Sequence, residues 1–506
     1  MDAKGKRKRE EATAEEVDND ETEAAQQPSP PRRIRGSTPI MPYKYLNDPV
    51  HGLIPIHEKH FEIIDTPIFQ RLRDLKQLGG MYLVFPGASH NRFEHCVGTC
   101  YLAGQWMQHL CKLNPGLATE REMFLVEVAG LCHDLGHGPF SHTFEGVMKT
   151  LCKNVGAQFE EWEHENLSVE LLRLINEEKG VLSEEELDKV AHMIRGKVWN
   201  DDPRKFLYRI VNNEKTSIDV DKFDYLSRDC KSAALPLGFD FNRLIEFSNV
   251  GDDYEIVFRP KEAYNIYQMF NTRFALHQQT YQHPVVKGIE LMISDIFLMA
   301  SRYLALEDMI REKDYRYYAS LTDGILRELE RKRIQTNSRQ AENDEEEAHN
   351  LAAARNLVLR MRNRDLYKFV AERKWLDQQK EMSMAGENLD RFNNEITQLL
   401  VVKIKFFASA GQPPFKSELF AHSAYLTTAE ISSMIPQGLP CDTFLRLYAK
   451  DTSDADRIQQ AVEEFRQLDA SHLSPLRVSE KTTRQHHLVK VPSRARKLNC
   501  DDGQNT

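Results

Sequence analysis

Hydrophobic residues recur at helical spacing through most of the first 400 residues, and runs that alternate like a strand are few. Thr66-Pro67 is typical of a helix start, with a capping threonine and a proline in the first turn. We expect this helix to end at Gly79-Gly80. Asn91 and Glu94 have the spacing of a capping box, so a second helix is predicted to begin there.

The run from Phe124 to Cys132 is almost entirely apolar, which predicts a buried helix. It should end at His133-Asp134, because Gly136 and Gly138 break the helical pattern. A buried aspartate at such a helix end is costly unless a cation compensates its charge. Coordination of a metal ion would remove that cost.

Two later helices carry polar residues where a structural helix would bury leucines. Asp221, Tyr225 and Asp229 are four residues apart and therefore share one face. A second stripe has the same spacing and consists of Asn265, Met269, Arg273, His277 and Tyr281. These stripes indicate the walls of a polar cavity; the alternative interpretation is two solvated faces.

The fold class predicted is mainly α, a helical core followed by a small α+β lobe. The lobe rests on strand-like runs at 399–408 and 444–449 and a helical run at 454–468. Residues 328–350 are charged and low in apolar positions, which predicts an exposed insertion. The expected division is a disordered tail with a basic cluster (1–40), the catalytic core (41–395), the C-terminal regulatory lobe (396–476) and a disordered basic tail (477–506).

The chain has 506 residues, 41% hydrophobic and 28% charged, which is globular composition. It contains no apolar run long enough for a membrane span and no secretory signal at its start. The eight cysteines lack paired metal spacing, so reduced thiols in the nucleus or cytoplasm are expected. The basic cluster Lys4–Arg9 is typical of a nuclear import signal, and a solvated tail is the alternative. The net charge of -10 does not favour general nucleic-acid binding.

Four residues in the first half of the chain could hold a hydrolytic metal ion: His95, His133, Asp134 and Asp221. Such an ion needs deprotonated ligands and an open position for water or a phosphate oxygen. Ligands from three helices can converge in the core of a bundle. A single histidine in such a helix is more often a core residue whose hydrogen bonds are made within the protein. An adjacent His-Asp at the end of an apolar helix is a more specific indication of a metal site. We therefore predict a metal-dependent phosphohydrolase.

These four residues match the H…HD…D signature of the HD-domain metal phosphohydrolases. The segments 47–52, 85–95, 132–142 and 219–225 resemble the vertebrate SAM- and HD-domain deoxynucleoside triphosphate (dNTP) triphosphohydrolases. The resemblance covers about residues 43–370, and the short charged N-terminus indicates a form without the SAM domain. It implies an HD-domain core that cleaves a dNTP into deoxynucleoside and inorganic triphosphate.

The resemblance also implies iron, zinc or manganese at the four ligands and Mg²⁺ with the nucleotide. His137 is the candidate general acid, since the leaving 5′-oxygen needs a proton. His164 matches the family's supporting histidine, and Glu145 stands where the family more often has the aspartate that orients His137. His142 lies close to the same site.

The implied substrate contacts surround the triphosphate and the sugar. The phosphate contacts are Arg92, Lys222 and Arg273, with His142 nearby. Around the base and sugar, the matching positions are Tyr281, Tyr225, Gln77, Asp229 and Leu78. Gln77 and Asp229 would read the 3′-hydroxyl, and Leu78 would exclude a 2′-hydroxyl.

Members of this family are activated by nucleotides that assemble a homotetramer. A first site, specific for GTP or dGTP, would use Lys44, Asp65, Gln70, Arg73 and Phe93, with Arg364 and Lys368 from another subunit. A second site, for a dNTP, would use Asn47, Val84, Arg243, Arg259, Lys261, Asn265 and His283. Tyr45 is assigned to the same pair of sites.

The chain departs from the family at the second activator site and has one candidate for regulation. Gln279 and Pro284 stand where the family often has basic residues, and a lysine is missing around 421–423. Different or weaker activator contacts are therefore expected. Ser474-Pro475 is a candidate phosphorylation site whose added charge would loosen the tetramer.

Two alternative functions stay open at this point. One is an HD-domain nucleotidase or phosphodiesterase; the cations around the pocket favour a triphosphate over its substrates. The other is a nucleic-acid-binding scaffold with a vestigial metal site. The complete ligand set and the acidic net charge argue against the scaffold.

The expected partners are dNTPs, GTP or dGTP, a second copy of the chain and single-stranded nucleic acid. The expected roles are control of dNTP pools and antiviral restriction.

Overall fold

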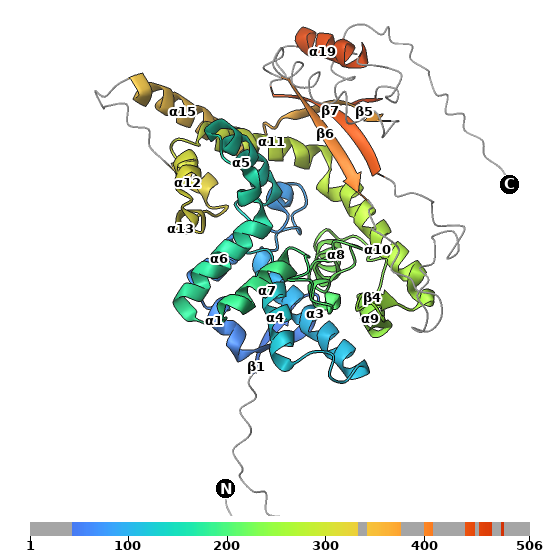
Figure 1. Ribbon diagram of the computed structural model, residues 1–506. Helices are drawn as coiled ribbons and strands as arrows, with labels where there is room; N and C mark the ends of the chain where they lie inside the picture. Colours follow the sequence, from blue (N-terminus) through green and yellow to red (C-terminus); the bar gives the residue numbers. More distant parts are fainter. Residues whose placement is uncertain are drawn as a thin grey trace, which may run out of the picture. The chain divides into compact units, whose positions relative to one another are not determined.

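The computed structural model describes residues 43–331, 342–375, 399–407, 441–450, 455–467 and 477–479. These residues are mainly helical, and small antiparallel sheets lie at both ends of the described chain (Figure 1). The mainly α fold with a small α+β lobe is therefore confirmed. The basic cluster Lys4–Arg9, the segment 421–423 and Ser474-Pro475 lie outside the described residues.

The described chain opens with a hairpin of β1 (Tyr43–Asp48) and β2 (Gly52–His57). Short helical turns follow, namely η1 (Glu58–His60), α1 (Phe61–Ile64), α2 (Pro67–Gln70), η2 (Arg71–Asp74) and η3 (Gly79–Leu83). Thr66 caps α2 as predicted, because its hydroxyl accepts from the backbone N–H of Phe69 at 3.3 Å.

The predicted end of the first helix at Gly79-Gly80 is wrong. The helical run ends at Asp74, and Leu75 is extended. Lys76 forms a β-bridge with Asn91, which pulls the backbone out of the helix. Gly79 instead begins the separate turn η3, with a φ of 50° that favours glycine.

Three helices form the centre of the core: α3 (Arg92–Leu113), α4 (Glu120–Cys132) and α8 (Val220–Ser232). The capping box of Asn91 and Glu94 is confirmed at the start of α3. The run from Phe124 to Cys132 is buried except for the partly exposed Glu127, so α4 is a core helix as predicted. Helix α3 packs against both α4 and α8, and this arrangement places the start of α3, the end of α4 and the start of α8 together.

The remaining elements of the core surround these three helices. They are α5 (His142–Val155), η4 (Phe159–Trp162), α6 (His164–Lys179), α7 (Glu184–Ile194), η5 (Lys205–Tyr208), α9 (Phe241–Glu246), β3 (Ser248–Val250), β4 (Ile256–Phe258), η6 (Pro260–Glu262), α10 (Ala263–Leu276), η7 (His277–Tyr281), α11 (Pro284–Met299), α12 (Leu306–Glu312), α13 (Tyr315–Tyr318), α14 (Ile325–Arg331) and α15 (Glu342–Arg362). Element η7 is a single π-helical turn, in which Gln282 N donates to His277 O at 2.9 Å.

The prediction of an exposed insertion at 328–350 is only partly correct. Residues 332–341 lie outside the described chain, but α14 and α15 flank them and pack against each other. Helix α15 buries Leu351, Ala354, Leu357 and Val358, so it is part of the core from Leu351 onward. The charged residues before Leu351 hid this apolar face from the sequence pattern.

The described part of the C-terminal lobe contains a four-stranded antiparallel sheet with the order β6-β7-β5-β8 and the helix α19. Its elements are β5 (Lys368–Trp375), β6 (Leu399–Phe407), β7 (Cys441–Ala449), α19 (Ala455–Gln467) and β8 (Arg477–Val478). The two predicted strands and the predicted helix are confirmed. Arg477–Val478 was expected to be disordered, but it pairs with β5 as an edge strand.

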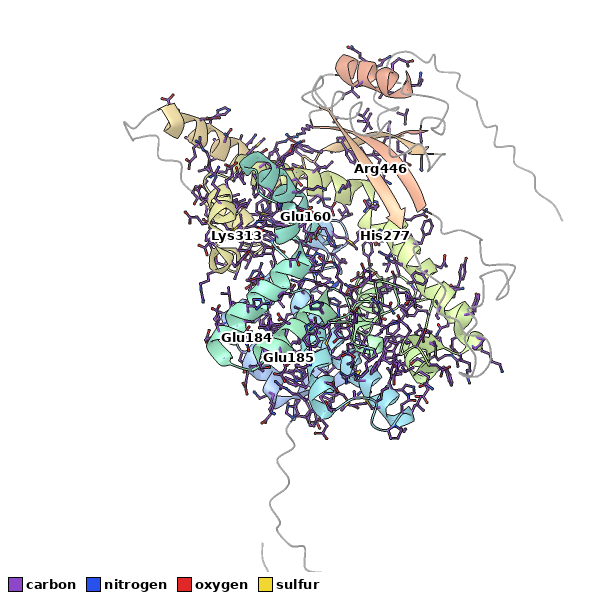
Figure 2. All side chains as sticks on the ribbon, in the orientation of Figure 1. Glu160, Glu184, Glu185, His277, Lys313 and Arg446 are labelled. Carbon is purple, nitrogen blue, oxygen red and sulfur yellow. The ribbon has the colours of Figure 1, made fainter. Side chains whose placement is uncertain are left out.

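Arg446 on β7 joins this lobe to the helical core (Figure 2). Its Nε donates to Glu372 at 2.9 Å, and its Nη1 donates to the backbone oxygen of Gln282 at 2.5 Å. The bond to Gln282 fixes the end of η7, just before α11 begins.

Within the described residues, no helix is both long enough and apolar enough to cross a bilayer.

Gly98 on α3 lies against the buried ion pair of Asp224 and Arg228 on α8. A Cβ atom at Gly98 would lie 2.0 Å from Asp224 Oδ1 and 2.6 Å from Arg228 Nη2. We predict that Gly98→Ala lowers the free energy of unfolding by about 2–4 kcal/mol, because both buried charges must move. Thermal unfolding measures this loss.

The matched control is Gly146→Ala on α5, where an added Cβ meets nothing within 4 Å. Alanine is the better helix former, so this control should be neutral or stabilising by about 0.5–1 kcal/mol. Equal stability of the Gly98→Ala variant and the wild type would contradict the proposed close contact.

Candidate active site

One cavity of about 490 Å³ lies among α3, the end of α4, α5, α8, α10 and α11. This volume is within the range of about 300–1,000 Å³ that is usual for small-molecule sites. The predicted residues that line it are Gln77, Leu78, Arg92, Asp134, His137, His142, His164, Asp221, Lys222, Tyr225, Asp229, Arg273 and Tyr281. The structure therefore brings the catalytic and substrate candidates into one place.

The two polar stripes behave differently. Asp221, Tyr225 and Asp229 all face the cavity, as predicted. In the second stripe only the end reaches it, with Arg273, His277 and Tyr281. Met269 is buried in the hydrophobic core, and Asn265 exchanges hydrogen bonds with the backbone of Asp240.

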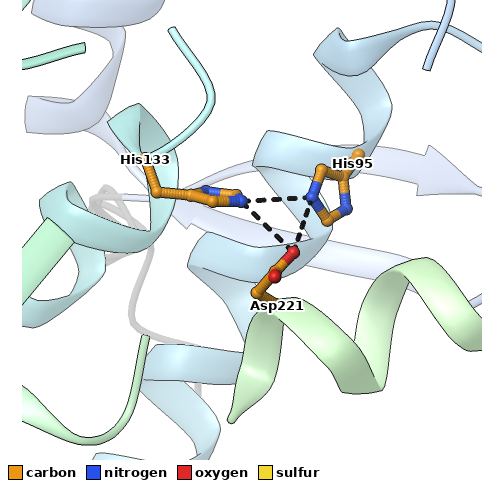
Figure 3. A group of neighbouring side chains, drawn as sticks. All are labelled: His95, His133 and Asp221. Carbon is orange, nitrogen blue, oxygen red and sulfur yellow. Dashed lines mark hydrogen bonds and ion pairs between the residues drawn. The ribbon is translucent and has the colours of Figure 1, made fainter. Parts of the chain in front are cut away.

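The four predicted metal ligands converge at one wall of the cavity, and Figure 3 shows three of them. The Nε2 atom of His95 lies 3.1 Å from Nε2 of His133 and 3.2 Å from Oδ1 of Asp221. Asp134 completes the group, because its two oxygens each lie 3.5 Å from one of these histidine nitrogens.

This spacing fits one divalent ion. Ligand atoms bound to one ion at about 2.1 Å lie roughly 3.0–3.5 Å apart in octahedral or tetrahedral geometry. The charge of the group also fits. Burial disfavours protonation of His95, but hydrogen bonds with Asp221 and Asp224 outweigh burial and raise its pKa to about 10. The cluster therefore attracts positive charge strongly.

Asp224 holds His95 in the orientation that metal binding needs. It accepts from Nδ1 of His95 at 2.7 Å, which leaves Nε2 free for the ion. It also accepts from Nε2 of His51 at 2.6 Å and from Arg228 at 2.8 and 2.9 Å. Arg228 in turn pairs with Asp48 at 2.9 Å. Sequence reasoning did not assign these four residues.

A signal for them was present in the sequence. Asp224 and Arg228 follow Asp221 on the same helix, and Asp48 and His51 lie in the segment 47–52 that resembles the family. The second ligand, His133, has a simpler support, because its Nδ1 bonds to the backbone oxygen of Gly130 at 2.8 Å.

Three histidines and one glutamate form a second cluster beside the metal ligands. The rings of His137 and His164 stack with their centres 4.0 Å apart. Glu145 accepts from Nδ1 of His164 at 2.5 Å and from Nδ1 of His142 at 2.8 Å. Its distance to Nδ1 of His137 is 4.0 Å, so the expected orienting bond to His137 is not formed. The carboxylate is already engaged by the other two histidines.

The charges in this cluster are unequal. Burial, with Arg92 and His164 nearby, holds the pKa of His137 well below its usual value. Burial also disfavours the charged form of His164, but Glu145 outweighs it and raises the pKa of His164 to about 9. At neutral pH, His164 therefore carries the proton and His137 is neutral. Nε2 of His137 lies 3.3 Å from Asp134.

Three cations face the cavity near the metal ligands. Arg92 pairs with Asp134 and donates from Nε to Ser141 at 3.0 Å. Lys222 is held by Asp219 at 2.9 Å. Nε of Arg273 is buried and has no hydrogen-bond partner among the described residues. An anion in the cavity would satisfy it.

Another part of the cavity lining contains Asp229, Tyr281, Gln77 and His277. Asp229 accepts from Tyr281 at 2.5 Å and lies 2.9 Å from Nε2 of His90. The side-chain oxygen of Gln77 is buried without a partner in the described chain. His277, which sequence reasoning placed only on a stripe, also has an unpartnered Nδ1 there. Burial and the charge of Arg273 lower the pKa of His277 to about 4.

The residues expected at the first activator site mostly gather in one surface cluster near β1 and α2. The Arg73 guanidinium lies 3.4 Å from the centre of the Phe93 ring and donates to Gln70 at 2.8 Å. Lys44 lies 3.9 Å from Asp65. Tyr45 is an exposed neighbour on β1. Arg364 is not part of this cluster, since it donates to the backbone of Leu83, and Lys368 begins β5.

The residues expected at the second activator site do not form one cluster within this chain. Arg243 and Arg259 both pair with Glu262 and cover the ring of Phe247, and Lys261 is next to them. Asn265 is bonded to Asp240 beside that group. The others lie elsewhere, with Asn47 on β1, Val84 packed near Leu78 and His283 against Phe85.

A family model for the HD domain matches residues 92–229, which contain the four metal-ligand candidates. The deoxynucleoside triphosphate triphosphohydrolase SAMHD1 homolog of Dictyostelium discoideum is 36% identical over 452 residues, covering 85% of this chain and 82% of that protein. The chain belongs to the SAMHD1 family. The SAMHD1 proteins of Gallus gallus and Homo sapiens are 41% and 39% identical over 373 and 362 residues.

The alignments cover the two vertebrate proteins only in part. The matched region is 67% and 65% of this chain, and 58% and 55% of the chicken and human proteins. The chain thus spans just over half the length of these SAMHD1 relatives. The cavity lining extends from Gln77 to Ser294, and the HD-domain match at residues 92–229 lies inside this range.

Asp224→Asn tests the support of the metal ligand His95. The amide keeps the shape of the side chain but loses the charge that holds Nδ1 of His95 and Arg228. We predict metal affinity about 10- to 100-fold weaker than in the wild type, measured as metal content against a competing chelator. Asp308→Asn on the exposed face of α12 is the control and should leave metal affinity unchanged. Wild-type metal retention in the Asp224→Asn variant would contradict this role.

Proposed function

We propose that the chain hydrolyses a dNTP to a deoxynucleoside and inorganic triphosphate. One observation carries this proposal: a single cavity is lined by Asp134 and Asp221, two of the four candidate metal ligands, and by three cations, Arg92, Lys222 and Arg273. A triphosphate is the substrate class that needs that many positive groups next to a hydrolytic ion. The names of the SAMHD1 relatives state the same activity for those proteins.

His95, His133, Asp134 and Asp221 would hold a transition metal, for which iron, zinc and manganese are the candidates. When bound, that ion supplies a Lewis acid for the α-phosphate and lowers the pKa of water, and Mg²⁺ would accompany the triphosphate. Arg92 and Arg273 bind phosphate oxygens through their planar donors, and Lys222 acts as a point charge. The exposed His142 ring stands at the mouth of the same site.

The leaving 5′-oxygen needs a proton, and the charge states favour His164 as its source over His137. His164 is held protonated by Glu145, whereas His137 is neutral. His137, the general acid expected from the sequence, stacks on His164 with the ring centres 4.0 Å apart and stays a candidate for the same step.

The sugar wall would select the deoxyribonucleotide. Gln77 and Asp229 are the hydrogen-bonding partners proposed for the 3′-hydroxyl, and Tyr281 would pack on the sugar or base. Leu78 packs in a small apolar cluster with Met81 and Val286. A carbon side chain fixed in this way offers no partner to a 2′-hydroxyl, so a ribonucleotide would lose that hydrogen bond and clash.

We also propose that guanine nucleotides activate the enzyme by assembling a homotetramer. Asp65 and Gln70 can read the edge of guanine, and Arg73 and Lys44 can meet its phosphates. The cluster of Arg243, Arg259 and Lys261 suits the phosphates of a second activating dNTP. Nuclear localisation through Lys4–Arg9 and a role in dNTP control or antiviral restriction are part of the same proposal.

The products of dGTP hydrolysis test the reaction directly. We predict inorganic triphosphate and deoxyguanosine, separated by ion-exchange chromatography, and loss of both metal and turnover in Asp134→Ala. Release of pyrophosphate or monophosphate would support a nucleotidase or phosphodiesterase instead. Absence of turnover together with tight single-strand binding would support a scaffold.

The guanine site has a separate test. We predict that Asp65→Ala keeps its metal but loses stimulation of dATP hydrolysis by GTP, because the guanine edge loses its carboxylate. The matched control is Asp74→Ala, which removes another exposed aspartate a few residues away. Full stimulation of the Asp65→Ala variant by GTP would refute the assignment.

A further inference from the structure

Two walls of the cavity come from segments far apart in the sequence. One is the stretch Gln77–Gly79, which carries the proposed sugar contacts, and the other is Phe140–His142. In the first segment, Gln77 and Leu78 connect η2 to η3; in the second, Phe140 and Ser141 immediately precede α5. These four residues lie outside regular helices and strands, so contacts with other segments help to fix the distance between the two walls.

Asp323, which lies between α13 and α14, bonds to Phe140 of the second wall and to Lys76, the residue just before the first wall. Its Oδ2 accepts from the backbone N–H of Lys76 at 2.9 Å. Its Oδ1 accepts from the backbone N–H of Phe140 at 2.8 Å. Its own N–H donates to the backbone oxygen of Asp74 at 3.2 Å. One half-buried carboxylate thus joins residues 64 positions apart in the chain.

Arg71 makes a second set of links between neighbouring segments. This buried guanidinium donates to the backbone oxygen of Leu321 at 2.9 Å, next to Asp323. It also donates to the backbone oxygens of Leu135 at 3.1 Å and His137 at 2.6 Å. The segment of Asp323 is therefore fixed to the loop that carries His137, and Asp323 adds the link to the wall of Gln77 and Leu78.

The backbone of the second wall needs such a link. Phe140 and Ser141 have φ values of 57° and 56°, a region that residues with a side chain rarely adopt. The two walls also approach closely, since a Cβ at Gly79 would lie 2.8 Å from the oxygen of Phe140. Ser141 adds one further bond, from its hydroxyl to the oxygen of Lys76 at 3.0 Å.

We propose that Asp323 is a positioning residue that sets the gap between the Leu78 wall and the Ser141–His142 wall, and thereby the fit of the deoxyribose. It touches no reacting atom and acts through the two backbone N–H groups. This inference rests on the proposed dNTP triphosphohydrolase function and deepens it, because it names what fixes the selectivity of the sugar wall.

Asp323→Asn is the first test. The amide offers one acceptor oxygen, and its NH₂ group faces a backbone N–H, so one wall is released. With GTP present as activator, we expect KM for dATP to rise about fivefold, the preference for dATP over ATP to fall by a similar factor, and kcat and metal content to change little. Burial raises the pKa of Asp323 to about 6, so assays about two pH units above this value compare the ionised wild type.

Hydrogen–deuterium exchange gives a readout that does not require turnover. Peptides that cover residues 72–80 and 138–144 should exchange faster in Asp323→Asn than in the wild type. Asp323→Glu keeps both acceptor oxygens but shifts them by a methylene, so it should change KM and sugar preference in the same direction. If Asp323→Asn does not fold, the KM and sugar preference of Asp323→Glu test the inference instead.

The matched control is Asp314→Asn, which removes an aspartate that accepts one backbone N–H, that of Tyr317, at 2.8 Å. It should leave exchange of both peptides, KM and sugar preference unchanged. Wild-type exchange, or faster exchange with unchanged KM and preference, in both Asp323 variants would overturn the inference. A wild type that hydrolyses no dNTP would instead overturn the proposed function, and exchange alone would then decide whether Asp323 holds the two walls.

Discussion

The carboxylate of Asp224 is the constraint on which the centre of the molecule depends. It is fully buried and satisfied by His51, His95 and Arg228, which come from the hairpin, α3 and α8. A charge in such surroundings is stable only while every partner stays in place. The orientation of the candidate metal ligand His95 therefore depends on the packing of these three elements. A change in the packing of the core would also change the site.

The close contact of α3 with α8 follows from the same group. Gly98 gives Asp224 and Arg228 room, and the two helices can then bring His95 and Asp221 within 3.2 Å. The end of α4 supplies His133 and Asp134 to the same place. Most of the cavity floor is therefore built from the ends of core helices, whereas its two irregular walls need separate support from Asp323 and Arg71.

Several helix boundaries and one face of the cavity could be predicted from the sequence, because short-range patterns determine them. The caps at Thr66 and Asn91, the apolar run into His133 and the spacing of Asp221, Tyr225 and Asp229 all depend on short-range geometry. What the sequence did not reveal depends on long-range contacts. Asp323 acts across about 250 residues on Lys76, and the early helix ends because Lys76 bridges to Asn91. The unequal pKa values of His137 and His164 depend on burial and on long-range partners, which have no local signature in the sequence.

The π turn at His277–Tyr281 has a consequence for how the cavity tolerates change in chain length. Such a turn holds one residue more than an α-helical turn, and its i→i+5 hydrogen bond takes up that residue with little change in helix phase. Loss of a single residue there would restore regular α-helical winding and leave Tyr281 on nearly the same side of the helix. In a regular α-helix the same deletion would rotate every later residue by about 100°, so this turn is the place where the cavity best tolerates a shorter chain.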